Sequence, residues 1–246
     1  LFAVFCIIAA SSSAVLGSRL FSSSVFDGKG FIVLLLLTLA VAIYFALSKP
    51  VAKARVATMV FIVTAFFLTL TLLLALVKIN SFTPDIQLEF KLSGFELLGV
   101  CVFDLVATLG LYKKENGMLA GALGGALPPI YFCITAISST LILSKELLLN
   151  SDMPFLLVWK TTFIGEFISH FEVYAICVML AATVVKSGLF LGLSVHAIGQ
   201  KYSPIIYVAA VACAAGIGYI ENWFFVYTFI ALAFGLIVPI FLLIKK

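Results

Sequence analysis

Apolar windows recur along the whole chain, separated by short connections that contain Lys, Arg, Pro and Asn. A helix needs roughly 20 predominantly apolar residues to cross about 30 Å of hydrocarbon, and these windows have approximately that length. The pattern predicts an all-α polytopic membrane protein that forms a single transmembrane domain over residues 1–246. The eight predicted spans are residues 1–17, 30–47, 56–77, 94–112, 118–143, 173–198, 204–220 and 223–244.

The composition agrees with this prediction. Apolar residues make up 64% of the chain, charged residues only 11%, and the mean hydropathy is +1.26, far above that of soluble domains. The net charge of +4 is spread over several short loops, which argues against nucleic acid as a partner. The chain begins with Leu and has no charged segment before its first apolar window, so we expect it to start inside or just before a helix of a longer protein.

Positive charges between the spans suggest an orientation. The loops after the second, fourth and sixth spans, together with the C-terminal tail, contain eight Lys and Arg residues, whereas the other connections contain six. Cytoplasmic loops are enriched in these residues, so the first set of loops and the C-terminus are predicted to be cytoplasmic.

Three ionisable residues fall inside or at the start of predicted spans: Glu96, Asp104 and Lys186. A charge at the middle of the bilayer costs roughly 2.5–3.5 kcal/mol on insertion scales, so each residue requires a partner or a watery cavity. Lys186 is at least twelve residues from either end of its span, farther than a lysine stem reaches. It therefore represents either a functional cation, paired with a carboxylate such as Asp104 or replacing a coupling ion, or a purely structural ion pair or snorkelling lysine from a displaced helix.

The surroundings of Asp104 suggest where a ligand would bind. Gly99 and Gly110 flank it within an otherwise strongly helical sequence, and glycines beside an intramembrane carboxylate permit an unwound segment with free backbone groups. A continuous helix with small packing residues is the alternative. Candidate ligand-binding or coupling residues are Asp104, Lys186, Gly99, Phe103 and Glu96.

Enzymatic signatures are missing from the sequence. It contains no HExxH, GxSxG or GxxxxGK[ST] pattern, and its two histidines are far apart without Cys or acidic residues at ligand spacing. We expect no catalytic residue, no metal and no cofactor, and His196 is interpreted as an interfacial histidine. The five cysteines all lie in apolar stretches and are expected to be small buried residues.

The stretch Met153 to Ser203 contains an apolar segment led by Pro154, an Ile-Gly-x-Phe phrase and a helix with Lys186 followed by aliphatic and aromatic residues. With these features it resembles the C-terminal third of the spore germinant-receptor B-subunit family, which belongs to the amino acid-polyamine-organocation transporter superfamily. Two upstream stretches, "YFALSKPVAKARVATMVFIV" and "VCVFDLVATLGLYKKENG", are similar to basic inner loops of this family and the spans beside them. The family often has Gly and Glu where this chain has Phe103 and Asp104, and Arg in place of His170. The residues that carry the resemblance in the long stretch are Pro154, Ile164, Gly165, Phe167, His170, Glu172, Lys186, Leu189 and Phe190.

The resemblance implies a LeuT-like fold of ten helices in two inverted repeats of five. The eight visible spans would then be helices three to ten, with the first two helices absent from this sequence. It also implies a bacterial cell membrane or spore inner membrane location and two partner subunits, an A-type membrane protein and a C-type lipoprotein.

Two functions from different classes follow. The leading hypothesis is a germinant-receptor subunit that senses a small nutrient such as an amino acid in a transporter-like pocket and triggers germination. The alternative is a proton-coupled permease for amino acids or related cations, and a structural subunit with an inactive pocket is a third possibility.

Overall fold

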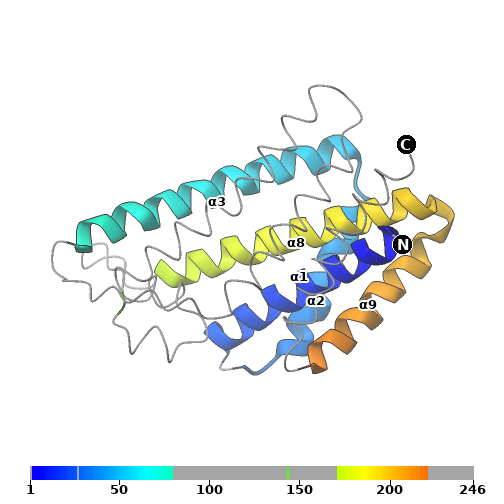
Figure 1. Ribbon diagram of the computed structural model, residues 1–246, viewed down its shortest axis with the longest axis horizontal. Helices are drawn as coiled ribbons and strands as arrows, with labels where there is room; N and C mark the ends of the chain where they lie inside the picture. Colours follow the sequence, from blue (N-terminus) through cyan, green and yellow to red (C-terminus); the bar gives the residue numbers. More distant parts are fainter. Residues whose placement is uncertain (1, 27, 80–142, 144–170, 221–246) are drawn as a thin grey trace, which may run out of the picture. The chain divides into compact units, whose positions relative to one another are not determined.

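The computed structural model describes residues 2–26, 28–79, 143 and 171–220, and every regular element in these ranges is helical. Four segments are long and apolar enough to cross a membrane, and a shorter apolar helix covers Phe31–Leu47. The all-α prediction is therefore confirmed for the described residues, whereas the predicted spans 94–112 and 223–244 and nearly all of 118–143 lie outside them. The elements are α1 (Phe2–Val25), α2 (Phe31–Leu47), α3 (Pro50–Ile79), α8 (Phe171–Ile198), the 3-10 turn η1 (Gln200–Tyr202) and α9 (Ser203–Tyr219) (Figure 1).

The first helix is longer than the sequence predicts, because α1 continues through the serine-rich segment to Val25. The hydroxyl of Ser22 donates to the carbonyl of Lys29 at 3.0 Å, and the hydroxyl of Ser23 donates to that of Leu20 at 3.1 Å. These bonds satisfy the hydrogen-bonding capacity of serine side chains, so the helix continues past the end of the apolar segment on which the prediction was based. The turn that follows needs glycine, because Gly28 and Gly30 have φ angles of 80° and 78°.

The basic loop after the second span is shorter than predicted, because α3 begins at Pro50 and not at residue 56. Proline is well suited to the first turn of a helix, where its missing N–H is not needed. Only Ser48 and Lys49 separate α2 from α3, and the hydroxyl of Ser48 donates to the carbonyl of Phe45 at 2.7 Å. Lys53 and Arg55, which we expected in a loop, are therefore helical.

The other helices agree closely with their predicted spans. α2, α8 and α9 each begin and end within two residues of the predicted boundaries. The cysteine prediction is only partly correct: Cys6 is buried and Cys213 is partly buried, but Cys177 is exposed on α8.

Chain contacts define two compact units, Leu1–Leu70 with Thr162–Glu221, and Thr71–Thr161 with Asn222–Lys246. The described helices belong to the first unit, which includes α3 as far as Leu70. Within it, α1 packs most extensively against α8, and both helices also contact α2 and α9. Figure 1 shows α1 and α8 running in opposite directions.

Glycines allow the close approach of α8 to its neighbours. A Cβ atom added to Gly188 would lie 2.8 Å from the carbonyl oxygen of Ala42 and 2.6 Å from Cδ1 of Phe45. A Cβ atom on Gly17 of α1 would lie 2.9 Å from Cβ of Thr183 on α8. Small residues at such positions are how membrane helices gain packing without a hydrophobic driving force between them.

Candidate functional site at the crossing of α1 and α8

Lys186 is the single candidate residue from the sequence that the structure describes. It is partly buried and lies near the middle of α8, fifteen residues after Phe171 and twelve before Ile198. At 1.5 Å per residue these separations are about 22 Å and 18 Å, which confirms its depth within an apolar helix. Gly99, Phe103, Asp104 and Glu96 lie outside the described residues, so the predicted pairing of Lys186 with Asp104 stays a prediction.

The residue after Lys186 marks where α8 crosses α1. The hydroxyl of Ser187 donates to the carbonyl of Ala10 at 3.0 Å, although the two residues are 177 positions apart. Ser187 is fully buried, so this bond lies in the interior of the helix pair. Thr183, one turn earlier on α8, faces Gly17 on α1.

Buried polar groups in the described part of the chain are all hydroxyls. Two more of them connect α1 to other helices. The hydroxyl of Ser11 is shared between the carbonyl of Ile7 in its own helix, at 2.8 Å, and that of Ala210 in α9, at 3.0 Å. The hydroxyl of Ser18 donates to that of Thr38 in α2 at 3.2 Å. Such bonds between membrane helices average about 0.6 kcal/mol. The complete set is Ser11, Ser12, Ser13, Ser18, Ser22, Thr38, Ser187 and Ser194.

Ser12 differs from the other hydroxyls because its Oγ is buried and has no hydrogen-bond partner. The side chain is only 2% exposed. A buried hydroxyl without a partner costs about 1–3 kcal/mol, and such groups call for an explanation such as a ligand or a bound water. Ser12 is therefore a residue of α1 whose buried hydroxyl can still bind a ligand or a water.

Ser12 and Lys186 lie at the same depth. The hydrogen bond from Ser187 to Ala10 places these two residues at one level of the helix pair. Because α1 and α8 are antiparallel (Figure 1), Ser12 and Lys186 are both displaced from that level in the same direction along the helix axes. The displacements are about 3 Å and 1.5 Å, well within one helical turn. We call this level of the two helices, with Ser12 and Lys186, the crossing site; the two side chains share a depth and not a contact, because Ser12 lies about 200° around α1 from Ala10, which faces α8.

The chemistry of the crossing site suits a carboxylate. A lysine ammonium offers three N–H donors, and a serine hydroxyl offers one O–H donor as well as acceptor lone pairs. Within the described residues no group of three His, Cys, Asp or Glu side chains is arranged to hold a metal. The N–H and O–H donors of these two side chains suit an organic anion.

The sequence prediction missed Ser12. The signal was visible as a triplet of serines, Ser11 to Ser13, inside a predicted span, but hydroxyls are common as packing groups in membrane helices. What distinguishes Ser12 is the absence of a partner, and that depends on helices far away in the sequence.

Several long apolar helices are compatible with an integral membrane protein, and this is the class that the described fold supports. Comparisons with protein-family models, with curated proteins and with solved structures find no match for the chain.

Proposed function

We propose that the protein is the B-type membrane subunit of a spore germinant receptor, which senses a small nutrient such as an amino acid and triggers germination together with an A-type membrane subunit and a C-type lipoprotein. The observation that carries the proposal is the crossing site: a buried, unpartnered hydroxyl on α1 at the depth of a mid-span lysine on α8. Each of these groups is of a kind that donates hydrogen bonds to the carboxylate of an amino acid.

The packing of the first unit supports the inverted-repeat fold. In a repeat of five and five helices, each helix has its counterpart five positions later, so helices three and four, which would be α1 and α2, correspond to helices eight and nine, α8 and α9. If the two repeats are related by symmetry, the contact between α1 and α9 should have an equivalent between α8 and α2. The structure has substantial contacts between both pairs of helices.

Individual residue contacts in the two pairs of helices are similar as well. The bonded pair Ala10 and Ser187 sets an offset of 177 residues between α1 and α8, which makes Gly188 the counterpart of Ser11. Ser11 reaches the carbonyl of Ala210, and Gly188 lies against the carbonyl of Ala42. Ala42 and Ala210 thus play similar parts, and both are fully buried, which is compatible with two repeats related by a two-fold axis.

Sensing requires a ligand to favour one of two conformations. A ligand that binds at the level of Ser12 and Lys186 stabilises the conformation of α1 and α8 in which it makes the better contacts. The shift cannot exceed the difference in binding free energy between the two conformations. No chemical step is needed.

Binding of amino acids to the full-length protein in lipid nanodiscs tests the proposal. We expect a subset of amino acids to raise its thermal midpoint, and Ser12→Ala and Lys186→Met each to abolish that rise. Ser13→Ala, in the neighbouring position of the same serine triplet, is the matched control and should keep it. If no amino acid or other small nutrient shifts the midpoint, or if Ser13→Ala is as damaging as Ser12→Ala, the crossing site is not the sensor.

Uptake by proteoliposomes separates a sensor from the alternative permease. A sensor binds its ligand without accumulating it, whereas a proton-coupled permease concentrates the same amino acid when a proton gradient is imposed. Robust gradient-driven accumulation would establish the permease.

The predicted pairing of Lys186 with Asp104 is tested with a double mutant. Removing one partner of a buried ion pair costs about 3–5 kcal/mol, because the other charge is left without compensation. Lys186→Met alone should therefore destabilise the protein more than Lys186→Met combined with Asp104→Asn. Additive effects of the two substitutions would exclude the pair.

A further inference from the structure

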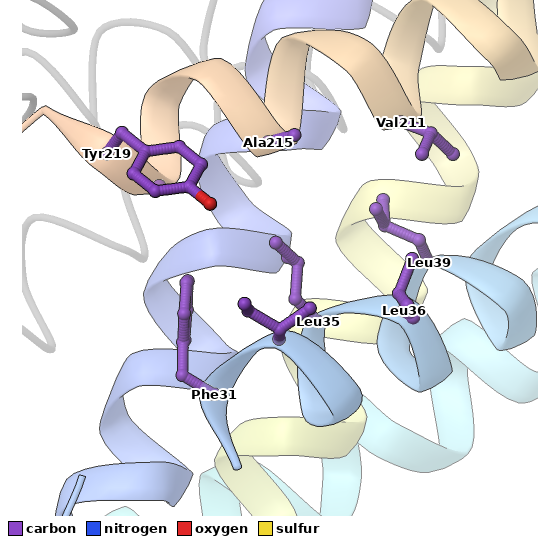
Figure 2. A pocket seen from close by; sticks show the side chains of 9 residues that line it. Phe31, Leu35, Leu36, Leu39, Val211, Ala215 and Tyr219 are labelled. Atoms are coloured by element: carbon purple, nitrogen blue, oxygen red, sulfur yellow. The ribbon is translucent and has the colours of Figure 1, made fainter. Parts of the chain in front are cut away.

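An apolar groove of about 170 Å³ separates α2 from α9. Leu35 and Leu39 are buried at its base, whereas Leu36 and Tyr219 are more than half exposed beside it. Figure 2 shows these side chains between the two helices, with the ring of Tyr219 reaching from α9 toward α2. The groove is lined by Phe31, Ile32, Leu35, Leu36, Leu39, Val211, Ala215, Gly218 and Tyr219.

One end of the groove lies beside a cation. Nη2 of Arg19 donates to the carbonyl of Gly218 at 2.7 Å, and its guanidinium carbon lies 5.7 Å from the centre of the Phe31 ring. Gly218 and Phe31 both line the groove, so two lining residues hold the Arg19 guanidinium at the end of the groove. Lys29, in the turn just before α2, adds a second, exposed positive charge.

Arg19 retains capacity to bind an anion. A guanidinium has five N–H donors, and the bond to Gly218 uses one of them. The bond to Gly218 and the contact with the Phe31 ring are the Arg19 interactions seen among the side chains that the structure describes, which do not include those of Asp27, Glu172 and Glu221. Arginine is the residue best suited to hold a phosphate by two parallel hydrogen bonds.

The geometry points to an anionic phospholipid as the occupant: we propose that its phosphate binds Arg19 and that one acyl chain lies in the groove between α2 and α9. From Phe31 to Leu39 the groove follows α2 for a rise of about 12 Å, starting at the end of the helix and running toward its middle. A lipid has this same arrangement, with charge at the membrane surface and hydrocarbon below it. Tyr219 belongs at the same level, because tyrosines favour the boundary between headgroups and hydrocarbon.

An anionic lipid is favoured over a zwitterionic one by charge. Arg19 and Lys29 place two cations at this end of the groove, and basic pockets between membrane helices are typical sites for anionic headgroups. The proposal does not depend on the crossing site, because Arg19 and the groove share no residue with Ser12 and Lys186.

Lipid retention measured by native mass spectrometry tests the charge. The full-length protein is reconstituted with equal amounts of phosphatidylglycerol and phosphatidylcholine and then transferred to detergent. We expect bound phosphatidylglycerol to exceed phosphatidylcholine by about tenfold, as a charge-assisted phosphate contact provides. Arg19→Gln should remove this preference, while Arg55→Gln, at an exposed arginine of α3, should leave it unchanged.

A second pair of variants tests the groove and leaves Arg19 in place. Ala215→Phe fills the groove and should lower retention of both lipids, whereas Ala212→Phe, at an exposed alanine of α9 that does not line the groove, should not. Equal retention in both alanine variants would overturn the proposal. So would an unchanged preference in Arg19→Gln, which would mean that an acidic residue such as Asp27 or Glu221 neutralises this arginine. A change in oligomer mass in Ala215→Phe without a change in bound lipid would identify the occupant as a second copy of the chain, and this also overturns it.

Discussion

The two faces of α2 show how differently membrane helices meet one another. On the face toward α8, Ala42 and Phe45 are buried against Gly188, so close that a single added methyl group would overlap a backbone carbonyl. On the face toward α9, large side chains hold the helices apart and leave an open apolar groove. The contact with α8 is built for fixed distance, and the groove is built for an exchangeable occupant such as lipid.

α9 repeats the same division. Ile206, Ala210 and Ala214 are buried, and Ala210 receives the hydroxyl of Ser11 from α1. Val211 and Ala215, on the neighbouring face, line the groove. Substitutions on the two kinds of face should therefore have effects of very different size.

Gly188→Ala should have the largest effect of the substitutions considered below. The added Cβ meets the carbonyl oxygen of Ala42, which cannot move without displacing α2, and overpacking of this kind costs about 1–3 kcal/mol. Thermal unfolding in a fixed detergent measures the loss.

Gly216→Ala is the matched control. A Cβ on Gly216 would have no neighbouring atom within 4 Å, and alanine is favoured over glycine inside a helix by roughly 0.5–1 kcal/mol. This variant should be as stable as the wild type or slightly more stable. Equal destabilisation by both substitutions would mean that glycine at position 188 is not needed for the approach of α2.

Gly17→Ala tests the crossing of α1 with α8 and should have a smaller effect. Its Cβ meets only the side chain of Thr183, whose Oγ1 and Cγ2 can rotate away although its Cβ, at 2.9 Å, cannot. Thr183→Gly removes the whole side chain, including the Cβ that alanine would keep, so the double variant should recover part of the stability that Gly17→Ala loses, and thermal midpoints of all four proteins measure the coupling. Strictly additive midpoint shifts would show that the two residues do not meet.

The serines of α1 should respond in opposite directions. Ser11→Ala removes the bond to Ala210 and should cost about 0.6 kcal/mol, while Ser12→Ala removes an unpartnered hydroxyl and should raise stability in the absence of ligand by up to about 1 kcal/mol. Unfolding of ligand-free protein measures both. A loss of stability in Ser12→Ala would reveal a partner for its hydroxyl and weaken the crossing site.

The sequence predicted those properties that depend on neighbouring residues alone. The depth of Lys186 and the ends of α2, α8 and α9 follow from the length of apolar segments, and they are confirmed. The ends of α1 and α3 were wrong because serine bonds and a helix-starting proline extend these helices beyond their apolar windows. The isolation of Ser12 and the bond of Ser187 to Ala10 join segments 177 residues apart, and no local pattern specifies them.

Leu36→Ala should have the smallest effect on the free energy of unfolding, and it tests whether lipid or protein covers the groove. Leu36 lines the groove and is 52% exposed; its neighbour Leu37, which does not line it, is 57% exposed. Lipid tails are as apolar as leucine, so where lipid covers a helix, loss of a leucine side chain removes little stability. Both Leu36→Ala and Leu37→Ala should therefore change the free energy of unfolding by no more than about 0.5 kcal/mol, as surface substitutions usually do. A much larger loss in Leu36→Ala than in Leu37→Ala would show that protein, and not lipid, packs into the groove, because only a protein neighbour would leave a cavity there when the side chain is shortened.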